Sequence, residues 1–350
     1  MTTAVSLRHH TTLQVGGEAR QFVSAATCQQ ALHHAREARL QGLPLLVLGG
    51  GSNVLVCDAG FPGMVLRWQD RSLEILHQSS DGVHVKVGGG WVWDDWVAEA
   101  VKRDWTGLEC LSGIPGQLGA APIQNIGAYG QEVGQQIVAC QVLEWESGVE
   151  SRIAASECGF GYRDSRFKRD WKGRYLVTAV EFLLHPGQAP QLRYKELRQK
   201  MEGRPHTLQE VRATVLAIRR SKSMVWDPAD PNHRSAGSFF VNPIVAADRA
   251  AQLAHDYPEM PKWPTADHNV KLSAAWLIEQ AGFPKGWGQG PAGLSSNHVL
   301  ALINRGNASA ADLIDLAAEV RRGVHRRFAV TLQPEPEFIG FDRSVEELLA

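Results

Sequence analysis

The sequence lacks the features of several large classes of protein. Its 36 lysines and arginines nearly balance 37 aspartates and glutamates, so no net positive charge is present to attract a nucleic acid. No apolar run approaches the ~20 residues that span a bilayer, and residues 1–12 contain no apolar core of a signal peptide. We therefore expect a cytoplasmic protein with no nucleic-acid partner and no membrane insertion.

The cysteines give no sign of a structural cross-link or a metal site. There are five of them, far apart, and none belongs to a CxxC or a cysteine–histidine spacing. We expect neither a disulfide framework nor a bound metal. Cys110 lies in a glycine-rich segment and could be a reactive thiol, but a small buried hydrophobic side chain is the favoured interpretation.

Glycine, in contrast, is abundant, with 34 among 350 residues against a usual ~7%. Two glycine triplets, at 49–51 and 88–90, each follow an apolar segment typical of a strand. Residues 107–134 are about a quarter glycine. Glycine lets backbone N–H groups approach phosphate oxygens closely, so the loops at 49–53 and 107–134 indicate a phosphate-bearing cofactor, with simple tight turns as the alternative. Neither loop matches a Rossmann or P-loop motif.

Helical and strand-like patterns occur throughout the chain, whose length indicates two or three domains. Strands are expected at 45–48, 83–87, 136–146 and 174–185. Apolar spacing predicts helices at 28–40, 93–101, 208–218, 271–281 and 310–327. Thr207 with Glu210, and Ser309 with Asp312, have the spacing of capping boxes at the start of two of these helices.

Several motifs occur in one order along nearly the whole chain. They are Gly-Gly-Gly-Ser-Asn at 49–53, Ile-Pro-Gly at 114–116, PIQNIGAYG at 122–130, FGYRDS at 160–165, GSFF at 237–240, VKL at 270–272, WLIEQAG at 276–282 and Pro-Glu at 334–335. Together they resemble the UDP-N-acetylenolpyruvoylglucosamine reductase family, flavin-dependent enzymes of peptidoglycan precursor synthesis. The resemblance implies an α+β protein with an FAD-binding fold of the vanillyl-alcohol-oxidase (PCMH) type. It implies two FAD-binding lobes, 1–69 plus 328–350 and 70–218, and an α+β substrate-binding domain, 219–327.

The resemblance also implies noncovalent FAD, with NADPH as the hydride donor. Many oxidases of this fold tether the flavin through a histidine near the first glycine loop, and residues 49–58 contain none. The residues implied to hold FAD lie in the two glycine-rich loops and are Gly49, Gly50, Gly51, Ser52, Asn53, Ile114, Pro115, Gly116, Gln124, Asn125, Gly127, Ala128 and Tyr129.

Three catalytic residues follow from the same resemblance. Reduction of UDP-N-acetylglucosamine enolpyruvate to UDP-N-acetylmuramate passes through an enolate, which needs stabilising charge and a proton at C2. Arg163 and Glu335 would stabilise the substrate carboxylate and the enolate, and Ser238 would donate the proton. The alternatives are a salt bridge from Arg163 to Asp164, a turn role for Ser238 and a solvated carboxylate at Glu335.

Five further residues match family positions near the UDP-sugar: Tyr162, Tyr194, Lys222, Asn242 and His298. Tyr194 resembles the tyrosine that the longer form of the family places over the substrate, and Lys222 would pair with the diphosphate. Val241 stands where many relatives have lysine. We expect a monomer whose small-molecule partners are the UDP-sugar and NADPH. A sugar or alcohol oxidase of the same fold and a non-enzymatic flavin- or UDP-sugar-binding protein are the alternatives.

Overall fold

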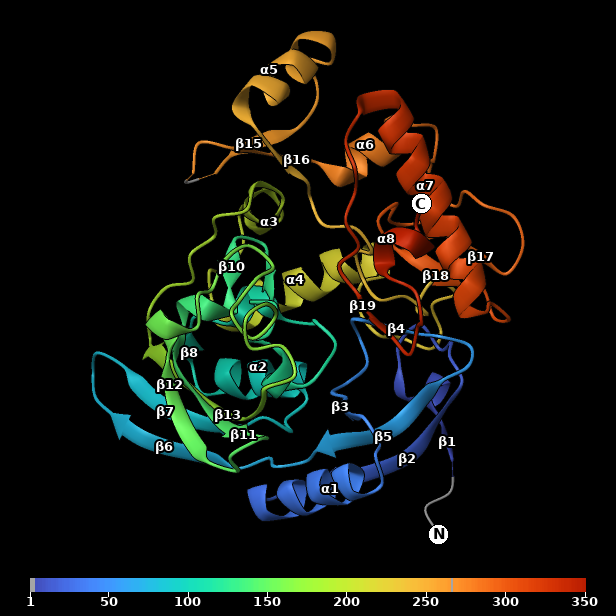
Figure 1. The fold of residues 1–350 in the computed structure, drawn as a ribbon. Helices are drawn as coiled ribbons and strands as arrows, with labels where there is room; N and C mark the ends of the chain where they lie inside the picture. The colour runs from blue at the N-terminus through green and yellow to red at the C-terminus, as the bar shows by residue number, and fades with distance from the viewer. Residues whose placement is uncertain (1–3, 266) are drawn as a thin grey trace. The chain divides into compact units, whose positions relative to one another are not determined.

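The structure, a computed structural model, describes residues 4–265 and 267–350 and contains helices and strands throughout these residues (Figure 1). The predicted α+β class is therefore confirmed. The residues group into two compact units. The first contains residues 19–51 and 62–226 with residues 4 and 5, and the second contains residues 6–18, 52–61 and 227–350. The division into two lobes and a third domain at the boundaries given above stays a prediction.

A six-stranded antiparallel sheet forms the centre of the first unit. Its order is β12-β11-β13-β7-β6, with β8 also paired to β13. The strands are β6 (Leu73–Gln78), β7 (Val83–Gly88), β8 (Trp105–Thr106), β11 (Ile137–Glu144), β12 (Glu150–Ala154) and β13 (Tyr175–Pro186). Helix α2 (Trp93–Lys102) packs its buried Trp93 and Trp96 into the same apolar cluster as the sheet residues Val85 and Phe182. The two tryptophans therefore face the core of the first unit.

A buried carboxylate lies on the sheet at Glu181 of β13, which is 3% exposed. Arg152 donates to both of its oxygens at 3.0 and 2.8 Å, and Gln141 donates at 2.6 Å. The Nε2 atom of His84 lies 2.9 Å from Oε2. Burial alone would raise the pKa of Glu181, but these hydrogen bonds hold it below its ordinary value.

A second sheet, of order β1-β2-β5-β3, consists of β1 (Val5–Ser6), β2 (Glu18–Ala25), β5 (Phe61–Trp68) and β3 (Leu45–Val47). Strand β3 runs parallel to β5 and ends directly before the first glycine loop. Helix α1 (Cys28–Leu40) begins after Thr27, whose side chain accepts a hydrogen bond from the N–H of Gln30. The helix ends just before Gly42, in agreement with the prediction.

The second unit is built around helix α7 (Ala310–Phe328) and an apolar cluster that includes Phe239, Phe240, Leu277 and Val320. Strands β4 (Val54–Val56) and β19 (Glu337–Ile339) pair in parallel. A three-stranded sheet of order β14-β16-β15 carries α5, and β17 pairs with β18. The remaining elements are β14 (Ile244–Val245), α5 (Ala247–Asp256), β15 (Lys262–Pro264), β16 (Val270–Leu272), α6 (Ala274–Gln280), β17 (Ala292–Leu294), β18 (Leu302–Asn304) and α8 (Val345–Leu348).

The structure corrects two predictions. The helix expected from residue 271 begins at Ala274, because residues 270–272 pair as β16 with strands on both sides. Helix α4 (Leu208–Ser221) has only half of a capping box: the Thr207 hydroxyl accepts from the N–H of Glu210, but the Glu210 carboxylate accepts from Arg204. The box of Ser309 and Asp312 at the start of α7 is complete.

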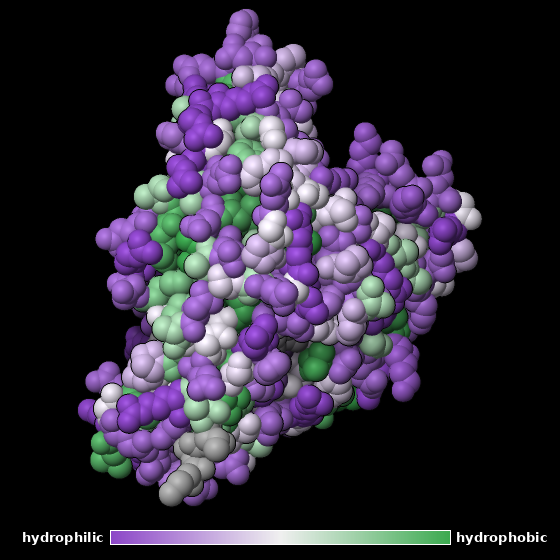
Figure 2. Space-filling view, turned by 90° about the vertical axis from the view of Figure 1, so that its right-hand side faces the viewer, coloured by the Kyte–Doolittle hydropathy of each residue, from purple (hydrophilic) through white to green (hydrophobic). Residues whose placement is uncertain are grey.

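Figure 2 shows hydrophilic side chains spread over the face that it presents, with apolar side chains in scattered patches between them. In the part of the chain that the structure describes, no helix combines the length and the apolar character needed to cross a membrane.

Candidate active site

Residues 49–51 of the first glycine-rich loop lie against the second glycine-rich loop, within the first unit. A Cβ atom built on Gly50 would lie 2.7 Å from the Cα atom of Gly116, so only glycine allows this approach. Trp93 donates its backbone N–H to the carbonyl of Gly116 at 3.0 Å and fixes the second loop to α2. Among the described residues, no hydrogen bond has the N–H of residue 49, 50 or 51 as its donor. The N–H groups of residues 49–51 and the close contact between the two loops fit a pyrophosphate such as that of FAD.

An ion pair fixes the start of the second loop. The Asp94 carboxylate of α2 accepts hydrogen bonds from Arg212 of α4 at 2.6 and 2.8 Å and from the backbone N–H of Gly113 at 2.6 Å. Burial raises the pKa of Asp94, but the hydrogen bonds from Arg212 and Gly113 outweigh it and leave the pKa below its ordinary value. Gly113, whose φ is +73°, is therefore held in place at the start of the loop.

The side chain of Asn125 fixes the later part of the second glycine-rich loop. The residue is 2% exposed, and its side chain donates to Glu132 at 3.0 Å and to the carbonyl of Gly161 at 2.9 Å, and accepts from Gly134 at 2.9 Å. These bonds close a short hairpin of β9 (Gly127–Ala128) and β10 (Gln131–Glu132). The amide of Asn125 is thus used within the protein, and a contact of this residue with a cofactor would come from its backbone.

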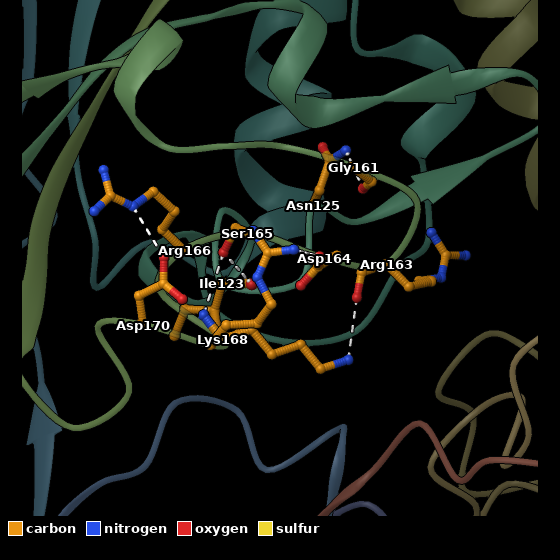
Figure 3. A network of polar contacts seen from close by, with 10 residues as sticks. Ile123, Asn125, Gly161, Arg163, Asp164, Ser165, Arg166, Lys168 and Asp170 are labelled. Carbon is orange, nitrogen blue, oxygen red and sulfur yellow. Dashed lines mark hydrogen bonds and ion pairs between the residues drawn. The ribbon is translucent and has the colours of Figure 1, made fainter. Parts of the chain in front are cut away.

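Arg163 does not form a salt bridge to Asp164, which was the alternative to its catalytic role. Its guanidinium donates to the carbonyl of Gly127 at 2.7 Å and lies over the Tyr162 ring, 5.6 Å from the ring centre. Asp164 pairs instead with Arg169. Figure 3 shows the Arg163 side chain directed away from Asp164, and its backbone, with φ of +54°, has the left-handed conformation. The turn therefore presents the arginine toward the β9–β10 hairpin.

A second group of charged and aromatic side chains lies at the end of α4. Lys222, which directly follows α4, forms an ion pair of 2.6 Å with Glu196 of α3 (Lys195–Met201). Tyr194 precedes α3, and its ring packs edge-on against Tyr129 with centroids 5.4 Å apart. Burial raises the pKa of Tyr129 to about 12, so its hydroxyl stays protonated.

Arg219 also belongs to this group and was not singled out in the sequence. It donates to the carbonyl of Met224 at 2.7 Å, and its burial lowers the pKa of the guanidinium, which stays charged. Neighbouring Cys110 is fully buried, and burial raises the pKa of its thiol above the ordinary value. The interpretation of Cys110 as a buried hydrophobic side chain is therefore confirmed.

The second unit brings the Ser238 and Glu335 segments together. The N–H of Glu335 donates to the carbonyl of Phe239 at 2.8 Å, and Asn53 donates its side-chain amide to the carbonyl of Glu335 at 3.2 Å. Ser238 is half-buried between Gly237, with φ of +72°, and the buried Phe239. The predicted proton donor and the predicted carboxylate thus occupy adjoining stretches of backbone.

Two of the residues expected near the substrate make structural contacts. The side-chain carbonyl of Asn242 accepts from the N–H of Ala274 at 2.9 Å and so binds the first residue of α6. The Nδ1 atom of His298 accepts from the N–H of Leu300 at 3.1 Å, within a tight turn. The amide nitrogen of Asn242 is the group of that residue with which a substrate contact would be made.

Comparison with known proteins gives matches over both units. The model of the UDP-N-acetylenolpyruvoylglucosamine reductase C-terminal domain matches residues 228–339, and that of an FAD binding domain matches residues 19–150. The UDP-N-acetylenolpyruvoylglucosamine reductase of Thermobifida fusca is 46% identical, over 97% of this chain and 99% of its own. That of Salinispora arenicola is 47% identical, over 95% and 94%. The crystal structure of the reductase from Thermus caldophilus superposes with a TM-score of 0.64 at 28% identity, covering 97% and 99%.

Proposed function

Because this chain belongs to the UDP-N-acetylenolpyruvoylglucosamine reductase family, we propose that it reduces UDP-N-acetylglucosamine enolpyruvate to UDP-N-acetylmuramate with NADPH as the hydride donor. The family confirms the predicted class of enzyme, an FAD-containing oxidoreductase of peptidoglycan precursor synthesis. The observation that carries the proposal is the 46% identity to a reductase over 97% of the chain. A fold-level likeness to an oxidase would not extend through both units in this way.

The first glycine loop would hold the cofactor without a covalent bond. The N–H groups of residues 49–51 can donate to a pyrophosphate, and residues 52–53, 114–116 and 124–129 would complete the FAD site. When bound, FAD would supply the hydride-transfer chemistry between NADPH and the enolpyruvyl double bond. The ion pair of Asp94 and Arg212 keeps the second loop in place for this role.

Arg163, Glu335 and Ser238 would act on the enolpyruvyl group. Arg163 supplies a permanent positive charge for the substrate carboxylate and for the negative charge that develops beside it. Glu335 is held by its backbone, through Phe239 and Asn53, next to the segment of Ser238, and it would orient the same end of the substrate. Ser238 would transfer its hydroxyl proton to C2 and regain a proton from solvent.

The remaining residues would bind the UDP-sugar. Lys222 provides a point charge for the diphosphate, and Tyr194 would cover the sugar beside Tyr162. Asn242 would contribute its side-chain nitrogen, because its side-chain carbonyl binds the start of α6, and His298 would contribute its imidazole. The sequence contains no separate dinucleotide motif, so NADPH and the UDP-sugar would use this site in turn and give ping-pong kinetics.

The decisive experiment follows the colour of the bound flavin without oxygen. NADPH should bleach the yellow, FAD-loaded protein, and UDP-N-acetylglucosamine enolpyruvate should then restore the colour. UDP-N-acetylglucosamine, which lacks the double bond, is the matched control and should leave the flavin bleached. Bleaching by NADPH without recolouring by the enolpyruvate would refute the proposed substrate.

A further inference from the structure

The ion pair between Lys222 and Glu196 determines what Lys222, in the proposed diphosphate site, contacts before substrate binds. The Nζ atom of Lys222 lies 2.6 Å from Oε2 of Glu196, and the two side chains are 31% and 35% exposed. Lys222 is the residue to which the proposed function assigns the diphosphate. A carboxylate of the protein therefore occupies the position at which a phosphate oxygen would bind.

Glu196 also lies within the turn that carries Tyr194. Tyr194 is 44% exposed and directly precedes α3, and Glu196 is the second residue of that helix. The turn rests on the β9–β10 hairpin, since a Cβ on Gly130 would lie 2.9 Å from the Cβ of Arg193. Two kinds of contact thus hold this turn: the Tyr194 ring against Tyr129, and the Glu196 carboxylate against Lys222.

The rest of α3 is held differently. Leu197 and Met201 are fully buried in an apolar cluster with Val211 and Val215 of α4. Breaking the ion pair would therefore loosen the turn at 194–196, which would keep only its Tyr194–Tyr129 contact, and would leave the body of the helix packed on α4. The two ends of α3 can respond independently to a charged ligand.

We propose that Glu196 is an internal competitor of the diphosphate: its carboxylate occupies Lys222 in the substrate-free enzyme, and a diphosphate that displaces it also releases the turn of Tyr194. The inference rests on the proposed diphosphate role of Lys222. A diphosphate carries more negative charge than one carboxylate and wins the exchange. A ligand without phosphate cannot win it, so Glu196 adds to the selectivity of the site.

The test measures the binding of UDP to the FAD-loaded full chain by calorimetry. Partly exposed ion pairs of this kind contribute ~0.2–1 kcal/mol, so Glu196→Gln should tighten UDP binding by about 1.4- to 5-fold. Lys222→Ala should weaken UDP binding, and the Glu196→Gln change should then have no further effect in the double variant. Glu202→Gln, at the exposed far end of α3, is the matched control and should bind UDP as the parent does.

A second measurement reports the turn itself. Hydrogen exchange of the backbone amides at 194–196 should be faster in Glu196→Gln than in the parent before any ligand is added, and unchanged in Glu202→Gln. Equal exchange in Glu196→Gln and the parent would refute the restraint of the turn.

The outcomes separate this inference from the function on which it rests. If Lys222→Ala binds UDP as the parent does, the diphosphate assignment fails, and the competition falls with it. If Lys222→Ala weakens UDP binding but Glu196→Gln does not tighten it, only the competition is refuted.

Discussion

Replacement of Gly50 by alanine tests whether the contact between the two glycine loops forms the cofactor site. The new Cβ would lie 2.7 Å from the Cα of Gly116, about 0.7 Å inside the 3.4 Å of an ordinary contact. The atom that it meets is backbone, so the loop at 113–116 must move. Overpacking of this kind costs ~1–3 kcal/mol. If FAD needs the unmoved loop, its dissociation constant should rise about 5- to 150-fold.

Gly49→Ala provides the matched control in the same loop. Its Cβ would meet the nearest side chains, those of Ala120 and Gln117, at 3.5 and 3.6 Å, which are ordinary contacts. The loss of backbone freedom in the unfolded chain is similar for both variants and cancels between them. We expect Gly49→Ala to change the free energy of unfolding by no more than ~0.5 kcal/mol. Fluorescence titration of the apoprotein with FAD gives both dissociation constants. Parent-like FAD binding by Gly50→Ala, or equal loss in both variants, would refute the reasoning.

Three further predictions address separate parts of the molecule. Ser238→Ala should leave flavin reduction by NADPH near the parent rate and slow reoxidation by the enolpyruvate ~10²- to 10⁴-fold in anaerobic stopped-flow experiments; equal slowing of both steps would indicate a packing role. Asp94→Asn should lower the free energy of unfolding by ~1–3 kcal/mol and weaken FAD retention, whereas the exposed neighbour Asp95→Asn should do neither; lost stability with normal FAD retention would contradict its positioning role. The pKa of Glu181 is lowered in the folded protein, so its stabilising effect should be complete above its ordinary pKa of 4.5 and should be lost as the pH falls through the folded pKa. The free energy of unfolding of the parent and of Glu181→Gln, measured at pH 7 and pH 3, tests this. A difference between the two proteins that is the same at both pH values would refute it.

The elements that the sequence predicted are those with a long one-sided apolar pattern. Helix α7 buries ten of its 19 residues, and its capping box marks its start without ambiguity. Helices α3 and α5 were not predicted, because each buries only two residues and so has too short an apolar pattern to show a period. The start of α6 was misplaced because the apolar pattern continues through β16, whose extended backbone depends on pairing with β14 and β15.

Within the site, contiguous motifs were visible and distant charge pairs were not. The loops at 49–53 and 122–130 are recognisable because their residues adjoin in sequence. Asp94 and Arg212 are 118 positions apart, and Glu196 and Lys222 are 26 apart. Each is an ordinary charged residue until the fold provides its partner. Only the packing of α2 and α3 against α4 makes these pairs, so no local pattern could have predicted them.

Synthesis on the ribosome delivers β4 long before its partner β19. Glu337 pairs with Val54, and the interval of 283 residues takes roughly 15 to 55 s at ~5–20 residues per second. The nascent chain therefore carries β4 without this parallel neighbour until residues 337–339 have been made. During that interval the open strand edge invites pairing with other chains.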